Sequence, residues 1–469
     1  MNVIYSTHTS PTYMPPLAIS NQQIVIGPKY QNHAEGGLIK SINVLPGRYD
    51  LAAIVSSIPE AQRPELSLVL VDSYQNCVPE NLRAVPGRKL LLVADTHHGG
   101  NPLQTIMAYA RQEPFDRIVV THDPHHLHWF AEADIAPAKY IPNVNCQMFA
   151  HGFNEDREPA IAFVGQAGQL HPRRRYMLDA IKRAGFPLTV RQAPAPAAAS
   201  LYGSTQITFN CSLNGDLNMR VFEVLAAGGF LVTDRLSPQA GLEKLFRRGK
   251  EYVDYETVDD LLGQLEYYLA RPQECIEIAK AGQATYFRAH QPKQRVLDLL
   301  DFAFDTSVGV TCEYDPRALR PGEDFGRNLR ERLAFYELFQ QLSLKAEQIV
   351  VCLDGALGAR VMADLVDLPR LKIQVWPRVN HSSRLKESLR DLGVLQQIDF
   401  PDTFPVKCDI QFMDLRTVMR LRDPTSLRAQ LLAVMMSGQS IGKLTRWLAS
   451  QGYFRIGDTH GLFERARQA

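Results

Sequence analysis

The sequence predicts an α/β protein built on parallel sheets. Short runs of β-branched and other apolar residues alternate with longer amphipathic runs along the chain, as strands covered by helices do. Runs such as Leu90–Ala94 are apolar without interruption, which indicates strands buried on both faces. With 469 residues, the chain has room for about three domains of ~150 residues each.

Composition and charge exclude several classes of protein. Hydrophobic residues make up 45% of the chain and charged residues 22%, which is typical of a globular protein. The net charge of +1 gives no overall field that would attract nucleic acid or an anionic membrane. The 7 cysteines form no C-x-x-C pair and suit buried thiols in a reducing compartment. Because we find no secretory pattern and no apolar stretch of about eighteen residues, we expect a cytoplasmic protein without a membrane span.

Three series of strands and helices predict three domains, at residues 1–155, 156–310 and 313–469. The polar segment His151–Pro159 separates the first two, and the proline-containing stretch Cys312–Glu323 precedes the third. Within the second series, Ala193–Ser200 is predicted to be a connector rich in alanine and proline. In the first series we expect strands at Val3–Tyr5, Gln23–Ile26, Leu51–Ser56, Leu66–Val71, Lys89–Ala94 and Arg117–Thr121.

The most informative segment follows an expected strand in the second series. Asn214 or Asp216 is a candidate cap for a helix with apolar residues at helical spacing. At about 100° per residue, Asp216, Arg220 and Glu223 fall on one face of that helix. Its amino end would face the crevice where parallel sheets bind ligands, and a diphosphate fits there. Glu223 could accept hydrogen bonds from sugar hydroxyls and Arg220 could neutralise a departing phosphate, whereas a surface Arg220–Glu223 ion pair is the plain alternative.

A glycine turn follows the first strand of the second series. Gly165 and Gly168 lack a Cβ, so the backbone can approach a ligand closely. Arg173, Arg174 and Arg175 open the next helix, where at least one of them is a candidate diphosphate clamp and a solvated basic face is the alternative. We select Arg173 and Arg175 as candidates. Because the chain contains no D-x-D triplet, we expect the helix dipole and arginines, rather than a metal ion, to stabilise the leaving group.

Three segments between Ala160 and His290 carry a family resemblance: FVGQAGQLHPRRRYMLDAI, NMRVFEVLAAGGFLVTD and GLEKLFRRGKEYVDYETVDDLLGQLEYYLARPQECIEIAKAGQATYFRAH. They resemble the C-terminal half of GT-B glycosyltransferases, particularly the CgeB-like group related to glycosyltransferase family 1. The resemblance implies a nucleotide-sugar donor between two Rossmann-like domains, with Glu223 at the nucleotide ribose. Asn218 and Asp216 are placed in the same donor-binding set. Many relatives carry another glutamate eight positions before Glu223, where this chain has Gly215.

Six histidines of the first domain crowd into residues 97–128, after two expected strands. The carboxyl ends of parallel strands form the ligand edge of an open sheet. Asp95 or His97 is therefore a candidate base for an acceptor hydroxyl, and His122 a candidate substrate contact. Two alternatives stay open. His122 and His126 could hold a metal ion at a spacing of four residues, or the loop histidines could only bond the backbone.

Two weaker resemblances lie outside these segments. Gly37 follows Glu35-Gly36 in a turn similar to the glycine loop of GT-B first domains, and it joins the candidate binding residues. Val350–Gly358 resembles the first motif of class I, FkbM-like methyltransferases, which implies S-adenosylmethionine (SAM) binding. The next expected strand, LKIQVWPRV, lacks the terminal acid that such enzymes use for the cofactor ribose. We therefore expect a scaffolding domain that positions the acceptor or drives homodimerisation, with SAM binding as the alternative.

Together these features predict a metal-independent glycosyltransferase that needs no cofactor. It would move a sugar from a nucleotide-diphosphate sugar to the hydroxyl of a glycan, protein, small molecule or modified nucleobase. Two alternatives remain: a bifunctional glycosyltransferase and SAM-dependent methyltransferase, and a non-catalytic nucleotide-sugar-binding module.

Overall fold

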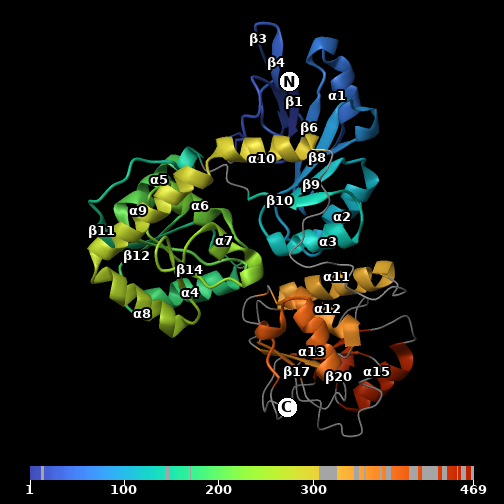
Figure 1. Cartoon of the computed structure of the whole chain (residues 1–469), viewed down its shortest axis with the longest axis vertical. Helices are drawn as coiled ribbons and strands as arrows, with labels where there is room; N and C mark the ends of the chain where they lie inside the picture. The colour runs from blue at the N-terminus through green and yellow to red at the C-terminus, as the bar shows by residue number, and fades with distance from the viewer. Residues whose placement is uncertain are drawn as a thin grey trace. The chain divides into compact units, whose positions relative to one another are not determined.

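The chain folds into two compact units, Met1–Cys312 and Glu313–Ala469. Figure 1 shows the computed structural model of the protein. The structure describes residues 1–11, 15–142, 147–168, 171–305, 325–342, 348–352, 355–366, 368, 372–375, 382–400, 410–414, 431–435, 441–451, 453–455 and 461–465. The predicted α/β class is confirmed, because each of the three predicted series contains its own sheet with helices around it.

The first unit contains two Rossmann-like lobes, each with its own parallel sheet. The first lobe has an eight-stranded sheet in the order β10-β9-β8-β6-β1-β2-β4-β3, in which every pair is parallel except β3 with β4. Its strands are β1 (Asn2–Ser6), β2 (Gln22–Gly27), β3 (His33–Glu35), β4 (Leu38–Asn43), β6 (Leu66–Val71), β8 (Arg88–Val93), β9 (Arg117–Val120) and β10 (Ala138–Tyr140). A small parallel pair, β5 (Gly47–Asp50) and β7 (Cys77–Glu80), lies outside this sheet.

The helices of the first lobe include one at a position predicted to be a strand. They are α1 (Leu51–Ser57), α2 (Pro102–Gln112) and α3 (Leu127–Glu132). The prediction of a strand at Leu51–Ser56 is wrong: the side chain of Asp50 caps α1 by accepting a hydrogen bond from Ala53 N. Only Leu51 and Val55 of this helix are buried, at the i, i+4 spacing of one helical face. The β-branched residues of this segment therefore misled the prediction.

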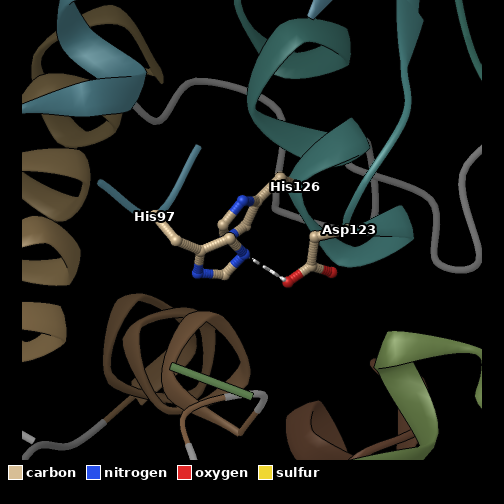
Figure 2. A group of neighbouring side chains, drawn as sticks. All are labelled: His97, Asp123 and His126. Carbon is tan, nitrogen blue, oxygen red and sulfur yellow. Dashed lines mark ion pairs between the residues drawn. The ribbon is translucent and has the colours of Figure 1, made fainter. Parts of the chain in front are cut away.

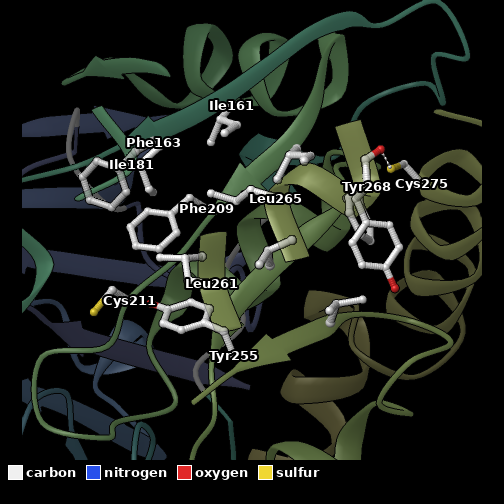
Figure 3. Packing of buried hydrophobic residues seen from close by; sticks show 14 of the residues in the cluster. Ile161, Phe163, Ile181, Phe209, Cys211, Tyr255, Leu261, Leu265, Tyr268 and Cys275 are labelled. Atoms are coloured by element: carbon white, nitrogen blue, oxygen red, sulfur yellow. Dashed lines mark hydrogen bonds between the residues drawn. The ribbon is translucent and has the colours of Figure 1, made fainter. Parts of the chain in front are cut away.

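The second lobe has a five-stranded, fully parallel sheet in the order β12-β11-β13-β14-β15. Its strands are β11 (Glu158–Val164), β12 (Leu188–Arg191), β13 (Thr205–Phe209), β14 (Leu231–Asp234) and β15 (Val253–Tyr255). Its helices are α4 (Pro172–Arg183), α5 (Ala195–Ser204), α6 (Met219–Ala226), α7 (Leu242–Leu245), α8 (Val258–Leu269) and α9 (Pro272–Ala289). Figure 3 shows one of its two apolar clusters, in which Phe163, Phe209 and Tyr255 pack beside Leu261 and Leu265.

The predicted connector Ala193–Ser200 is largely helical in the structure. Most of it belongs to α5, whose prolines lie at the N-cap and in the first turn, where a missing N–H costs no helical hydrogen bond. The alanines that follow have the highest helix propensity of any residue. The segment that its alanine and proline content predicted to be a connector therefore forms the start of α5.

The last helix of the first unit, α10 (Pro292–Phe304), packs on the first lobe. Leu299 and Phe302 join the apolar cluster formed by β1, β6 and β8, and Arg117 donates a hydrogen bond to the carbonyl of Asp305. The chain thus returns to its first lobe after completing the second, so that both lobes belong to one compact unit.

The second unit has a mixed six-stranded sheet in the order β17-β16-β18-β19-β21-β20. β21 runs antiparallel to both of its neighbours, and the other pairs are parallel. Its elements are α11 (Phe325–Leu342), β16 (Gln348–Cys352), α12 (Gly355–Leu365), β17 (Lys372–Val375), α13 (Ser382–Asp391), β18 (Ile410–Asp414), β19 (Leu431–Met435), α15 (Ile441–Ser450), β20 (Tyr453–Arg455) and β21 (Gly461–Arg465). The predicted boundary at Cys312–Glu323 lies outside the described residues, as does Asp354.

Two expectations from the composition can be compared with the structure. Among the described residues, Cys77, Cys211 and Cys275 are buried free thiols, as predicted. No helix in the described part of the chain is long and apolar enough to cross a bilayer.

Candidate functional site

The loop after β8 is ordered by the carboxylate of Asp95. Its Oδ1 accepts hydrogen bonds from the backbone N–H groups of His97, at 2.8 Å, and His98, at 3.2 Å, and its Oδ2 lies 2.5 Å from His98 Nδ1. Burial disfavours the charged form of Asp95, but the hydrogen bond from His98 and the charges of the surrounding imidazoles together lower the pKa of this carboxyl. Asp95 therefore fixes both the loop and the imidazole of His98.

His98, rather than His97, is the accessible histidine of this loop. Its side chain is 31% exposed, whereas that of His97 is 2% exposed. Burial opposes protonation of His98, yet the bond to Asp95 raises its pKa above the usual value. The His98 ring lies 5.7 Å from the ring of His171 in the second lobe. An imidazole held in this way by a carboxylate can accept a proton from a bound hydroxyl.

His97 belongs to a buried group of three side chains, His97, Asp123 and His126, which we call the histidine–aspartate cluster. His97 Nε2 lies 3.2 Å from Asp123 Oδ2, and His126 Nε2 lies 3.8 Å from the same oxygen. Figure 2 shows both rings beside the carboxylate. Burial opposes protonation of His97, but Asp123 and Asp216 raise its pKa to about 9. The candidate base His97 is thus ion-paired inside the lobe.

His122 does not join this cluster. Its Nδ1 lies 3.0 Å from the hydroxyl of Thr121, and burial lowers its pKa. The hypothesis of a metal site on His122 and His126 is therefore not supported by the geometry, because the group that could hold an ion among the described residues consists of His97, Asp123 and His126.

In the second lobe, the loop after β13 is held by its own side chains. Asp234, at the end of β14, accepts hydrogen bonds from both the N–H and the hydroxyl of Ser212. Asp216 Oδ1 accepts from the N–H groups of Leu213, at 2.7 Å, and Asn214, at 3.2 Å. Burial opposes ionisation of Asp216, but the nearby charge of His97, the hydrogen bond from Asn214 N and the charge of His98 together lower its pKa. Asp216 is therefore a buried, charged carboxylate, and its charge acts on His97 of the first lobe.

The helix after this loop begins later than the sequence predicts. The cap of α6 is Asn218, whose Oδ1 accepts a hydrogen bond from Arg220 N, and neither Asn214 nor Asp216 caps it. Asp216 precedes the helix, so the predicted common face reduces to Arg220 and Glu223. The side-chain oxygen of Asn218, a predicted binding residue, is used for capping.

Glu223 is half-buried on α6. Its Oε2 accepts a hydrogen bond of 3.3 Å from the hydroxyl of Tyr202 on α5. Burial raises the pKa of Glu223, and the charge of Arg220 only partly offsets this effect. A poorly hydrated carboxylate of this kind has a strong preference for hydroxyl donors.

Because Gly165 has no side chain, there is room beside it for the guanidinium of Arg220. Arg220 Nε donates a hydrogen bond of 2.7 Å to the carbonyl of Val164, Nη1 donates to Asn210 Oδ1, and the guanidinium lies 4.6 Å from the centre of the Phe163 ring. A Cβ on Gly165 would collide with Nη2 of Arg220, and the φ of Gly165, +144°, suits only glycine.

The three consecutive arginines of α4 have three different environments. Arg173 is buried and forms an ion pair of 3.2 Å with Asp234, whereas Arg175 is exposed and lies 3.9 Å from Asp179. Neither selected arginine therefore takes the predicted place of a diphosphate clamp. Arg174 is the arginine that lies beside the glycine turn. Its guanidinium donates to the carbonyls of Gln166 and Cys211, beside the glycine turn.

Arg174 and Arg220, which we call the arginine pair, share the ring of Phe163. The guanidinium of Arg174 lies 5.6 Å from the ring centre. Burial, together with the positive charge of Arg220, lowers the pKa of Arg174 to about 10. Burial and the charge of Arg174 also lower the pKa of His171 to about 4. Positive charge is thus concentrated at one place between the glycine turn and the start of α6, as an anion-binding site requires.

Gly37 lies far from these residues in the topology. Gly36 and Gly37, both with positive φ, form the tight turn of the β3–β4 hairpin. Because this turn precedes β4, it lies at the amino edge of a sheet whose carboxyl edge carries Asp95 and His98. The assignment of Gly37 to the site is therefore wrong, and its φ is explained by the hairpin.

Arg174 and His98 lie at the candidate site, but neither was among the residues selected from the sequence. Each stands beside a residue that was selected. The helical geometry that spreads three consecutive arginines over three directions was recognisable, but it could not tell which one faces the glycine turn. The Asp95-x-x-His98 spacing would have pointed to His98, because an aspartate three residues earlier can bond both its N–H and its ring.

A part of the chain matches a known family. Residues 173–301, which contain α6 and most of the second lobe, match the family model described as "Glycosyl transferase-like". The match includes Arg174, Arg220 and Glu223. Among curated proteins, none matches this chain in sequence.

Several solved structures are similar to the chain at low identity. Sucrose-phosphate synthase from Thermosynechococcus elongatus aligns at 10% identity over 64% of this chain and 98% of its own, with a TM-score of 0.45. A glycosyltransferase from Rickettsia africae gives the same identity and TM-score, over 64% and 97%. HepE from Anabaena, solved with UDP and glucose, also aligns at 10% identity, over 64% and 99%, with a TM-score of 0.45.

Proposed function

We propose that the protein is a glycosyltransferase that moves a sugar from a nucleotide-diphosphate sugar to an acceptor hydroxyl. The observation that carries this proposal is the arginine pair: two guanidinium groups lie over one aromatic ring, beside a glycine turn and close to the amino end of α6. The family match over residues 173–301 supports the same reaction class. Two close cations, one with a lowered pKa, are stabilised when a diphosphate lies between them.

The remaining groups of the second lobe suit the rest of the donor. Glu223 would accept hydrogen bonds from the nucleotide ribose, since its carboxylate is poorly hydrated. Asp216 would face the transferred sugar, because its charge acts on His97 of the first lobe. This role compensates for the position occupied by Gly215, where many relatives in the wider clan carry a glutamate.

The transfer step needs a base on the acceptor side. We assign this role to His98, oriented by Asp95 through Nδ1. The imidazole takes the proton of the acceptor hydroxyl while its oxygen bonds to the anomeric carbon. The bond from that carbon to the diphosphate oxygen breaks, and the arginine pair neutralises the charge of the leaving nucleotide diphosphate.

In this proposal, no Mg²⁺ or Mn²⁺ ion takes part at the diphosphate. Turnover that requires added Mg²⁺ or Mn²⁺ and stops in EDTA would contradict this part of the proposal. We also keep a cytoplasmic location and a homodimer formed through the second unit as predictions.

Thermal-shift measurements with UDP-, GDP-, TDP- and CMP-sugars test the donor class. We expect one nucleotide to raise the melting temperature of the protein, and we expect Glu223→Ala to reduce that rise. Glu277→Ala, at an exposed position of α9, is the matched control and should leave it unchanged. If no nucleotide sugar stabilises the wild-type protein, the proposal is wrong. If the nucleotide binds but neither transfer nor hydrolysis occurs with any acceptor, the alternative of a non-catalytic binding module is favoured.

One observation favours a second activity in the second unit. β17 and β18 lie on opposite sides of β16, so the strand order reverses beside β16, and α12 begins at Gly355 just after this strand. In open α/β sheets, such a switch point is where ligands bind. The resemblance to class I methyltransferases therefore keeps SAM binding as the alternative to a scaffolding role. Titration calorimetry of the full chain with SAM separates them, since micromolar affinity would exclude pure scaffolding.

A further inference from the structure

The histidine–aspartate cluster of the first lobe is not used by the proposed transfer reaction. His97 comes from the loop after β8, whereas Asp123 and His126 come from the loop and the short helix after β9. All three residues are buried, with exposed fractions of 5%, 0% and 0%. The cluster therefore joins two loops at the carboxyl edge of the sheet, and one of these loops carries Asp95 and His98.

The ligand-type atoms of the cluster converge. One atom from each residue can be chosen so that all three lie within 4.8 Å of one another. Asp123 Oδ2 is 3.2 Å from His97 Nε2 and 3.8 Å from His126 Nε2. Zinc bonds of about 2.0–2.2 Å in a tetrahedral site separate neighbouring ligand atoms by about 3.3 Å. The distance from His97 Nε2 to Asp123 Oδ2 is already close to this value. His126 Nε2 would have to move about half an ångström towards Asp123 Oδ2 to reach it.

The surrounding contacts orient the same atoms. Asp123 Oδ1 accepts a hydrogen bond of 2.9 Å from His125 N, which turns Oδ2 towards the two rings. His126 Nδ1 lies 2.6 Å from the hydroxyl of Thr96, so this contact leaves Nε2 as the atom that faces Asp123. Metal-binding histidines are usually held in this way through their second ring nitrogen.

From this geometry we propose that His97, Asp123 and His126 bind one divalent transition-metal ion of the zinc class. Two imidazoles and a carboxylate select such ions over Mg²⁺, which prefers oxygen ligands and retains water. The ion would fasten the loop after β8 to the loop after β9, and would thereby hold Asp95 and His98 in place. The inference goes beyond the proposed glycosyl transfer and does not depend on it.

The first test is the metal content of the full-length protein purified without a histidine tag. Elemental analysis should find ~1 equivalent of zinc or a similar metal, and a strong chelator should lower the melting temperature. Adding Zn²⁺ should restore the melting temperature. Co²⁺ bound in place of zinc should show the visible absorption of a low-coordinate nitrogen and oxygen site.

Variants then locate the ion. We expect His126→Ala and Asp123→Ala to bind metal at least 10-fold more weakly, because loss of a single supporting partner already costs about 10-fold to 100-fold. His33→Ala, at an exposed position of β3, is the control and should bind as the wild type does. If a cluster variant does not fold, the wild-type measurements still decide.

Two outcomes would overturn the inference. One is a wild-type protein without bound metal whose melting temperature does not respond to Zn²⁺ or Co²⁺. The other is undiminished metal binding in folded His126→Ala and Asp123→Ala variants. The first would mean that a proton shared by His97 and Asp123 takes the place of the ion. Neither result bears on donor binding, which is measured separately with nucleotide sugars.

Discussion

Arg220 occupies the space that a side chain at Gly165 would need. A Cβ on Gly165 would collide with Nη2 of Arg220, and Arg220 reaches this place because its Nε donates to the carbonyl of Val164. The glycine turn was predicted to admit a ligand to the backbone. The structure gives it a more specific task, which is to admit the guanidinium that belongs to the proposed diphosphate site.

Gly165→Ala should therefore reduce transfer by displacing Arg220. We expect kcat to fall about 100-fold, as a shift of about 1 Å in a catalytic group can cause. Gly185→Ala is the control, since Gly185 also has a positive φ, of +82°, but has open space where a Cβ would lie. Both variants carry backbone strain, so equal losses of activity would contradict the explanation. Steady-state kinetics and melting temperatures measured on both variants separate the two effects.

Replacement of Arg174 and Arg175 tests which arginine holds the diphosphate. Arg174→Ala should weaken nucleotide-sugar binding and lower kcat by about 10²–10³, because it removes a cation from the transition state. Arg175→Ala should change neither, since its side chain is 62% exposed and lies beside Asp179. Calorimetric titration with the donor and initial rates provide the measurement. A larger loss with Arg175→Ala would reverse the assignment.

Replacement of Arg173 should lower the free energy of unfolding of the protein. Its guanidinium is paired with Asp234, which also binds the N–H and hydroxyl of Ser212 and so holds the loop after β13. Arg173→Ala leaves a buried carboxylate without its cation, which costs about 3–5 kcal/mol. Urea unfolding of this variant beside Arg175→Ala gives the comparison. A change in unfolding free energy below about 0.5 kcal/mol, the usual value for an exposed site, would contradict the role.

The sequence was sufficient to predict most of the strands, because strands buried on both faces form apolar runs. β6, with every residue buried, is apolar at every position except Ser67, as expected of a strand covered on both faces. The prediction of a strand at Leu51–Ser56 failed because so short a segment with β-branched residues contains no information on which of its faces is buried. The cap of α6 was placed up to four residues too early for a related reason: Asn214, Asp216 and Asn218 are all good caps, and only the packed loop selects the last.

The site was predictable at the level of loops and not at the level of single side chains. The carboxyl ends of β8 and β9 were recognised as a ligand edge, and histidines from both loops do gather there. Which histidine turns inward depends on a partner 26 residues away, since Asp123 pairs with His97 and leaves His98 to Asp95. Pairing across two loops leaves no pattern in either segment alone, so His97 was selected in place of His98.

The pair of Asp95 and His98 gives a prediction about pH. The pKa of His98 is raised because Asp95 favours its protonated form, and a base must be neutral to act. Activity should therefore fall as the pH drops through this raised pKa. In Asp95→Asn the raising charge is gone, so the acidic limb of kcat should move to lower pH, while the plateau falls because the ring is no longer oriented.

The size of the loss and the controls make this test specific. His98→Ala should lower the plateau by about 10²–10⁴, the usual contribution of a general base. Asp156→Asn, at an exposed position before β11, should leave both the limb and the plateau unchanged. If Asp95→Asn keeps the wild-type acidic limb, the limb belongs to another group and His98 is not the base. If His98→Ala instead retains full activity while Asp95→Asn loses it, the aspartate itself takes the proton, and His98 has no part in the step.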